Sequence, residues 1–349
     1  MKADELQHLD DLISVFAKAA GISPAALRLT LRPSLDHQSN SLYDVQTNSA
    51  HWILKEYLKE DEWEESPRRE FEALNLLKPL GIAPRPLFFE PLSSSHKPLV
   101  AYEFMEGEMW GRCRPSQSQL AQLAQVWIAM HNLPTENLWL SRGFDSITSL
   151  ESRLLAGAQI YNAWVESEFP SGRQAAEILL AECERRHSIF AELSSCQPAL
   201  CFCRADPRFA NVIQQPNDEI GLVDWEDSGL RDPAIDSADL IMHPNQEDLL
   251  SPDEWNAFFQ PYLVVRGKLD TEYSHRIHLY QAIFQLLYGM RILMQAVSQL
   301  QNRQPVQPLV NEMPIQTRLR RYWARMMAYP ATDFSSQLES LANTQFFPL

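Results

Sequence analysis

Residues 203–213 read Cys-Arg-Ala-Asp-Pro-Arg-Phe-Ala-Asn-Val-Ile, and residues 222–233 read Leu-Val-Asp-Trp-Glu-Asp-Ser-Gly-Leu-Arg-Asp-Pro. They contain a carboxylate at Asp206, an amide at Asn211 and a second carboxylate at Asp224. A short apolar run over 198–202 precedes the first stretch, and it predicts a buried strand. The proline after Asp206 fixes its own φ and restricts the residue before it, so regular structure should end there.

The segment between the two stretches predicts a β-hairpin. Residues 211–214 and 220–224 are both strand-like, and the turn-forming run Gln-Pro-Asn-Asp separates them. A hairpin would return Asp224 to the side of Asn211. Phosphoryl transfer from ATP needs such a set of groups, because one carboxylate orients or deprotonates the acceptor hydroxyl while an amide and another carboxylate hold magnesium.

This stretch resembles the catalytic and metal-binding loops of the aminoglycoside phosphotransferase and choline kinase family. The family pattern is His-Gly-Asp, four residues, Asn, then a hairpin and Asp-Trp/Phe-Glu, with Gly and Asp-Pro following. The matching positions are Asp206, Asn211, Asp224, Trp225, Glu226, Gly229, Asp232 and Pro233. The family's His and Gly are replaced here by Arg204 and Ala205. The resemblance implies that Asp206 is the catalytic base and that Asn211 and Asp224 bind Mg²⁺.

The same resemblance implies an α+β, two-lobed, protein-kinase-like fold, with an antiparallel sheet in the N-lobe and a mostly helical C-lobe. A chain of 349 residues is long enough for two cores. We expect the nucleotide-binding lobe over 1–105 and the catalytic and substrate-binding lobe over 106–349. Apolar spacing predicts helices over 3–20, 117–131, 147–196 with a break near 170–172, 252–264, 270–302, 314–329 and 334–343.

A predicted strand, His-Trp-Ile-Leu-Lys, ends in Lys55, the family position of the lysine that contacts the α- and β-phosphates. A Ser-Pro pair at 66–67 predicts the N-cap and first turn of a helix, on which Glu70 shares a face with Leu74. An inward carboxylate needs a cation, and Lys55 is the candidate. Glu72 is the alternative partner, and a solvated strand-end lysine is the alternative interpretation of Lys55.

Two further elements of the expected ATP site are less specific. Asn40 ends a loop over 33–40, like the family's phosphate-binding loop, but this loop contains no glycine. The strand over 98–105 leads into Glu-Gly as the family's hinge does. The resemblance implies that backbone groups of Glu103 and Met105 contact the adenine.

Composition restricts the partners. The net charge is −15, with 45 acidic against 30 basic side chains, which argues against a nucleic-acid partner. An acidic surface favours cationic acceptors, although it also simply keeps a protein soluble. Five cysteines without framework spacing predict a reduced, cytoplasmic protein. No segment reaches membrane-spanning length, so we expect no membrane partner.

We therefore expect a phosphotransferase that uses ATP and Mg²⁺ and acts on a hydroxyl of a small molecule from the amino alcohol, aminoglycoside or sugar class. The alternative is a catalytically silent nucleotide-binding or regulatory protein on the same fold, as Arg204 and the glycine-free loop allow. Protein kinase activity is disfavoured, because Trp225-Glu226 replaces the expected Phe-Gly and no Ala-Pro-Glu follows.

Overall fold

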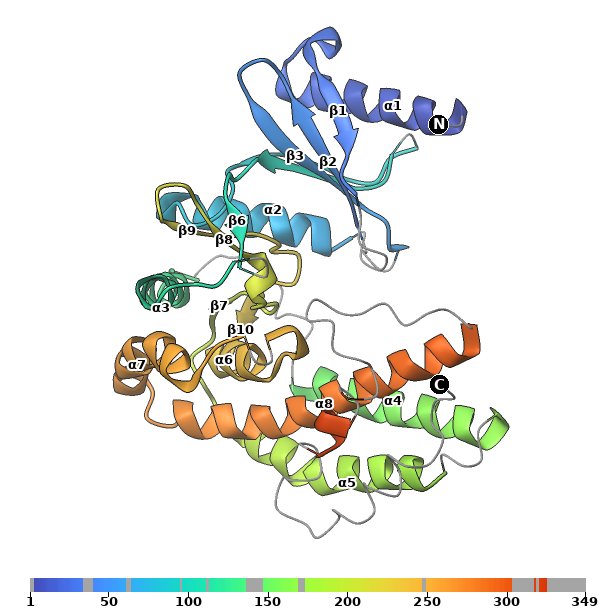
Figure 1. Cartoon of the computed structure of the whole chain (residues 1–349), viewed down its shortest axis with the longest axis vertical. Helices are drawn as coiled ribbons and strands as arrows, with labels where there is room; N and C mark the ends of the chain where they lie inside the picture. The colour runs from blue at the N-terminus through green and yellow to red at the C-terminus, as the bar shows by residue number, and fades with distance from the viewer. Residues whose placement is uncertain are drawn as a thin grey trace. The chain divides into compact units, whose positions relative to one another are not determined.

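The computed structural model describes residues 3–33, 40–60, 64–94, 96–110, 113–135, 147–168, 173–246, 249–302, 317 and 320–324 (Figure 1). The chain forms two compact units. The first comprises Met1–Gly143, Phe202–Asp206 and Ala210–Leu230, and the second comprises Phe144–Cys201, Pro207–Phe209 and Arg231–Leu349. The predicted catalytic hairpin thus belongs to the same unit as the N-terminal sheet. The assignment of nucleotide binding to residues 1–105, and of catalysis and substrate binding to residues 106–349, stays a prediction.

The first unit is built on a five-stranded antiparallel sheet in the order β1-β2-β3-β5-β4. Its strands are β1 (Arg28–Leu31), β2 (Asn40–Gln46), β3 (His51–Tyr57), β4 (Pro86–Glu90) and β5 (Leu99–Glu103). The strands expected over 51–55 and 98–105 are present as β3, which continues to Tyr57, and as β5, which ends at Glu103. β3 is central, and its Lys55 lies opposite Leu42 on β2 and Val100 on β5.

Successive side chains of β3 point to opposite faces of the sheet. Leu54 packs in an apolar cluster with Leu12 and Phe16 of helix α1 (Ala3–Ala20). This helix lies beside the sheet at the top of Figure 1. Glu56 lies on this same face and accepts a hydrogen bond from the Tyr43 hydroxyl at 3.0 Å. Lys55 faces the other side, where helix α2 (Ser66–Leu77) lies.

Helix α2 begins one residue earlier than expected. Glu65 occupies the N-cap position, and no side-chain bond caps this end of the helix. The prediction that Ser66 caps the helix is therefore wrong, because Ser66 is already buried within the first turn. Pro67 lies in that turn as predicted, where its missing N–H leaves no helical bond unmade.

After β5, the first unit continues into a three-stranded sheet with the order β6-β8-β9 and into helix α3 (Gln117–His131). The strands are β6 (Glu108–Met109), β8 (Val212–Gln214) and β9 (Ile220–Leu222), and β8 with β9 forms the predicted hairpin. Gly107 has φ +143°, and a Cβ there would lie 2.2 Å from the Gln214 carbonyl oxygen. Only glycine allows the chain to pass the hairpin this closely.

The short strand before Asp206 differs from the prediction in its bounds. β7 spans Cys201–Cys203 and pairs with β10 (Gly229–Arg231), whereas the sequence predicted a strand over 198–202. Pro198 has no N–H to donate to a ladder, which favours a later start. Cys201 and Cys203 are buried on this strand, and all five cysteines are free thiols.

The second unit is helical. Its long helices are α4 (Ile147–Glu168), α5 (Arg173–Ser195), α6 (Pro233–Met242), α7 (Pro252–Leu269) and α8 (Tyr273–Asn302). α7 extends five residues beyond the expected end at 264. Of the helix expected over 314–329 the described residues 317 and 320–324 are helical, and 334–343 lies outside the described residues. Among the residues described, none of the helices is both long and apolar enough to span a membrane.

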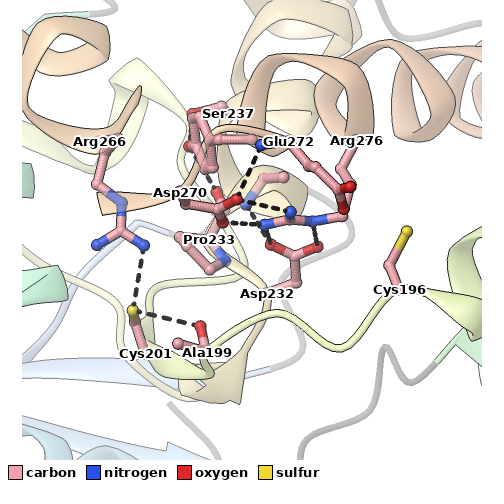
Figure 2. Close-up of polar contacts among 12 residues, drawn as sticks. Cys196, Ala199, Cys201, Asp232, Pro233, Ser237, Arg266, Asp270, Glu272 and Arg276 are labelled. Atoms are coloured by element: carbon pink, nitrogen blue, oxygen red, sulfur yellow. Dashed lines mark hydrogen bonds and ion pairs between the residues drawn. The ribbon is translucent and has the colours of Figure 1, made fainter. Parts of the chain in front are cut away.

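A buried ion-pair network joins three of these helices (Figure 2). Asp232 caps α6 by accepting from the Ala234 N–H at 3.0 Å. Its carboxylate also accepts from Arg276 Nε at 2.7 Å and Nη2 at 3.1 Å. Arg276 reaches Asp270 at the end of α7 as well, with Nη2 to Oδ2 at 2.5 Å. Burial opposes the charge of Arg276, but these two carboxylates hold its pKa above the usual value.

Candidate active site

Lys55 is the centre of the candidate site. Its Nζ lies 2.8 Å from Glu70 Oε2, 2.8 Å from Asp224 Oδ1 and 2.9 Å from Glu226 Oε2. The side chain is only 4 % exposed, so Lys55 is not a solvated strand-end lysine. The pairing with Glu70 that helix periodicity predicted is thus observed, and the alternative partner Glu72 lies at a partly exposed position of α2.

The charges of this cluster are not balanced. Burial favours a neutral Lys55 amine, but the combined charges of Asp224, Glu226 and Glu70 outweigh burial and hold the Lys55 pKa well above its usual value. Burial, together with the Asp224 and Glu70 charges, raises the pKa of Glu226 to about 7, although Lys55 opposes that shift. One lysine therefore faces three carboxyl groups.

This excess of negative charge fits a divalent cation. Oxygen atoms of Glu70, Asp224 and Glu226 lie within 4.8 Å of one another. Carboxylate and amide oxygens are the ligands that Mg²⁺ takes in proteins. Glu226 was absent from the predicted ligands, although its place two residues after Asp224, in the Asp-Trp-Glu run, was a signal that could have identified it.

Asp206 and Asn211 lie together on the loop after β7. Asn211 ends a short 3-10 turn (Phe209–Asn211), and its Nδ2 donates to Asp206 Oδ2 at 3.0 Å. Asn211 is buried, whereas Asp206 remains partly exposed. The Asp206 side chain is thus partly accessible to solvent and is held by the Asn211 amide.

Asp224 follows β9 in a left-handed conformation with φ +68°. Such a conformation is unfavourable for a residue other than glycine and typically persists only where the surroundings impose it. The hairpin places it as predicted, because the Val223 N–H donates to the Asn211 carbonyl oxygen at 3.0 Å. The predicted base and both predicted metal ligands are therefore brought together within one compact unit.

The other residues predicted for the ATP site, Asn40, Glu103 and Met105, each make contacts within the protein. Asn40 is buried, and its Nδ2 donates to Glu226 Oε2 at 2.6 Å, so it joins the carboxylate cluster. The Glu103 N–H already donates to the Arg85 carbonyl at 2.9 Å, which leaves the Glu103 carbonyl as the group able to contact an adenine. The Met105 side chain packs on Gly221, where a Cβ would lie 1.9 Å from its sulfur. Residues 34–39 of the glycine-free loop lie outside the described residues.

The chain belongs to the phosphotransferase enzyme family, whose model matches residues 30–274. This range includes strands β2 to β5 of the N-terminal sheet, the Asp206 loop and the hairpin. Family membership and the structural similarities below confirm the predicted α+β, protein-kinase-like fold. No curated protein sequence matches the chain.

Solved structures with this fold include several kinases of small molecules. A choline/ethanolamine kinase family protein from Mesorhizobium loti is 16 % identical, with a TM-score of 0.60, and the match covers 96 % of this chain and 99 % of the other. A spectinomycin phosphotransferase in complex with ADP and spectinomycin is 14 % identical, with a TM-score of 0.62 and coverage of 96 % and 98 %. Choline kinase from Cryptosporidium parvum is 15 % identical, with a TM-score of 0.61 and coverage of 96 % and 99 %.

Proposed function

We propose that this protein transfers the γ-phosphoryl group of ATP to a hydroxyl of a small molecule. The observation that carries the proposal is the clustering of Asp206, Asn211 and Asp224 in the same unit as the Lys55–Glu70 pair. A carboxylate able to orient a hydroxyl and a buried lysine able to contact phosphates are thus combined, as ATP-dependent phosphoryl transfer requires.

Each residue has a distinct role in this proposal. Asp206 orients the acceptor hydroxyl and accepts its proton late in a loose transition state, where position matters more than base strength. Lys55 contributes positive charge to the α- and β-phosphates, and Glu70 keeps the lysine oriented. Asn211, Asp224 and Glu226 would hold Mg²⁺, which when bound neutralises charge on the phosphate oxygens.

The acceptor in this proposal is a hydroxylated amine or sugar. Proteins with the same fold include kinases of choline and ethanolamine and a spectinomycin phosphotransferase. The net charge of −15 favours a cationic member of this class. Retention of a base and its neighbouring metal ligands weighs against a catalytically silent protein, which needs neither.

The test is ADP release from Mg·ATP with a panel of amino alcohols, aminoglycosides and sugars. Asp206→Asn keeps the shape of the side chain and should lower kcat by at least about 100-fold while ATP affinity changes little. Asp253→Ala, an exposed position on α7, is the control and should behave as wild type. Undiminished turnover in the Asp206 variant would mean that another group is the base. Mg·ATP binding without turnover on any acceptor would favour the silent alternative.

A further inference from the structure

Arg204 connects the two segments that carry the expected metal ligands. Its Nη2 donates to the Asn211 carbonyl oxygen at 3.0 Å and also to the carbonyl oxygen of Val223, the residue before Asp224. The Asn211 oxygen additionally accepts the Val223 N–H at 3.0 Å. One guanidinium nitrogen therefore connects the Asp206 loop with the end of the hairpin.

A guanidinium suits this position better than an imidazole would. Each terminal guanidinium nitrogen carries two hydrogens, so one atom can donate to two neighbouring carbonyls. An imidazole has at most one hydrogen on each nitrogen, and its two nitrogens point in different directions. A histidine in place of Arg204 could therefore satisfy one of these carbonyls and would leave the other without this bond.

The orientation of the guanidinium is fixed by packing. Arg204 is 1 % exposed, and its Cζ lies 5.2 Å from the ring centroid of Trp225, the residue after Asp224. Trp225 is itself fully buried and stacks on Phe202 with the ring centroids 5.8 Å apart. Arg204 thus contacts the residues on both sides of Asp224, through the Val223 carbonyl and the Trp225 ring.

We propose that Arg204 is a positioning residue for the metal site, which fixes Asn211 and Asp224 relative to each other before a cation binds. Asp224 adopts an unfavourable φ of +68°, so its conformation must be imposed by its neighbours. Arg204 holds both of those neighbours. The replacement of histidine by arginine is then a working variant of the site rather than a sign of lost activity. This inference rests on the proposed function for the identity of the metal ligands.

The experiment measures Mn²⁺ binding by electron paramagnetic resonance, with and without ADP, so it does not depend on turnover. Loss of an outer partner of metal ligands typically costs 10–100-fold in affinity. We expect R204M and R204H to weaken Mn²⁺ binding by about tenfold or more, with R204H the milder because one bond can be kept. ADP affinity without metal should change less than about twofold. R204K should recover part of the affinity, since its ammonium can donate to both carbonyls but cannot stack as a plane.

R266M provides the matched control, because Arg266 is also a buried arginine near an aromatic ring but belongs to the second unit. It should lower thermal stability and leave Mn²⁺ affinity unchanged. Wild-type Mn²⁺ affinity in folded R204H and R204M would overturn the inference, and so would a wild-type protein that binds no Mn²⁺. A wild-type protein that binds Mn²⁺ but phosphorylates no acceptor would contradict the proposed function alone, provided that the variants still rank as expected.

Discussion

Asn211 donates a hydrogen bond from Nδ2 to Asp206 Oδ2 across 3.0 Å, so the expected metal ligand and the expected base are in direct contact. Both residues lie on one loop, and the bond fixes how the Asp206 carboxylate is turned. A change at Asn211 should therefore act on the proposed base as well as on the proposed metal site. The two effects should appear together in the kinetics.

We expect Asn211→Ala to reduce kcat by at least about 100-fold and to raise the Mg²⁺ concentration needed for half-maximal rate, because it removes a ligand and frees Asp206. Steady-state rates over a Mg²⁺ titration measure both quantities. Asn217→Ala, in the exposed hairpin turn, is the matched control and should change neither. An unchanged Mg²⁺ dependence in Asn211→Ala would rule out a ligand role.

Lys55→Met should destabilise the protein by about 3–5 kcal/mol at pH 8, because it leaves the buried Glu70 and the mostly buried Glu226 without their cation. Urea unfolding of the variant and wild type measures this difference. The exposed Lys18→Met in α1 should change stability by less than about 0.5 kcal/mol. The double variant Lys55→Met/Glu226→Gln should recover part of the loss, since the two sites are in contact. A fully additive double variant would show that the pair is not coupled.

Glu226 should make stability depend on pH. Its pKa in the folded protein is about 7, above the usual 4.5, so the unfolded chain releases this proton first as the pH rises. Its contribution to stability is complete below about pH 4.5 and is lost between about pH 4.5 and 7. Glu226→Gln cannot titrate, so its stability relative to wild type should improve across this window. Urea unfolding at several pH values measures the difference, and parallel curves would contradict the assignment.

Arg276→Met should lower the free energy of unfolding by about 3–5 kcal/mol, because the buried Asp232 and the partly exposed Asp270 lose the cation that pairs with both of them. The adjacent His275→Ala removes an exposed ion pair with Glu192 and should cost at most about 1 kcal/mol. Chemical unfolding of both variants gives the comparison. Equal losses of unfolding free energy in the two variants would mean that the ion pairs of Arg276 stabilise the protein no more than an exposed pair does.

Ala205 occupies the family's glycine position with φ +66°. Ala205→Gly should raise stability by about 1 kcal/mol, because glycine adopts this conformation without a Cβ clash. Ala121→Gly within α3 serves as the control and should lower stability by about 1 kcal/mol, as glycine does in helices. Thermal unfolding would show the opposite signs. A loss at both positions would show that the alanine methyl group makes a compensating contact.

Local sequence signals accounted for most of the fold and for the main site contacts. The alternation of residues 51–55 gave β3, and the shared face of Glu70 and Leu74 gave the contact with Lys55, because both periods are properties of the backbone itself. The predictions that were wrong or incomplete concerned residues whose environment depends on segments distant in sequence. Ser66 resembles an N-cap but is buried in the first turn, and the entry of Glu226 into the cluster depends on the hairpin that brings it to Lys55.

The role of Arg204 could not be read from its residue type. Its Nη2 donates to two backbone carbonyl oxygens, one on each of two segments. Carbonyl positions depend on how two segments approach each other, and that information is absent from any local pattern. The same limit applies to Asn40, whose bond to Glu226 joins residues 186 positions apart.

Lys55 and Glu56 are adjacent on β3 and point to opposite faces of the sheet. This arrangement also disfavours a shift in the pairing of β3 with its neighbouring strands. A slip of one residue would exchange the two faces. Glu56 would then join Glu70, Asp224 and Glu226, and Lys55 would enter the apolar cluster beneath α1. Four carboxylates without a cation and a buried unpaired amine are both strongly unfavourable. Lys55, for which we propose a contact with the phosphates, and its neighbour Glu56 thus also disfavour wrong pairings of the central strand during folding.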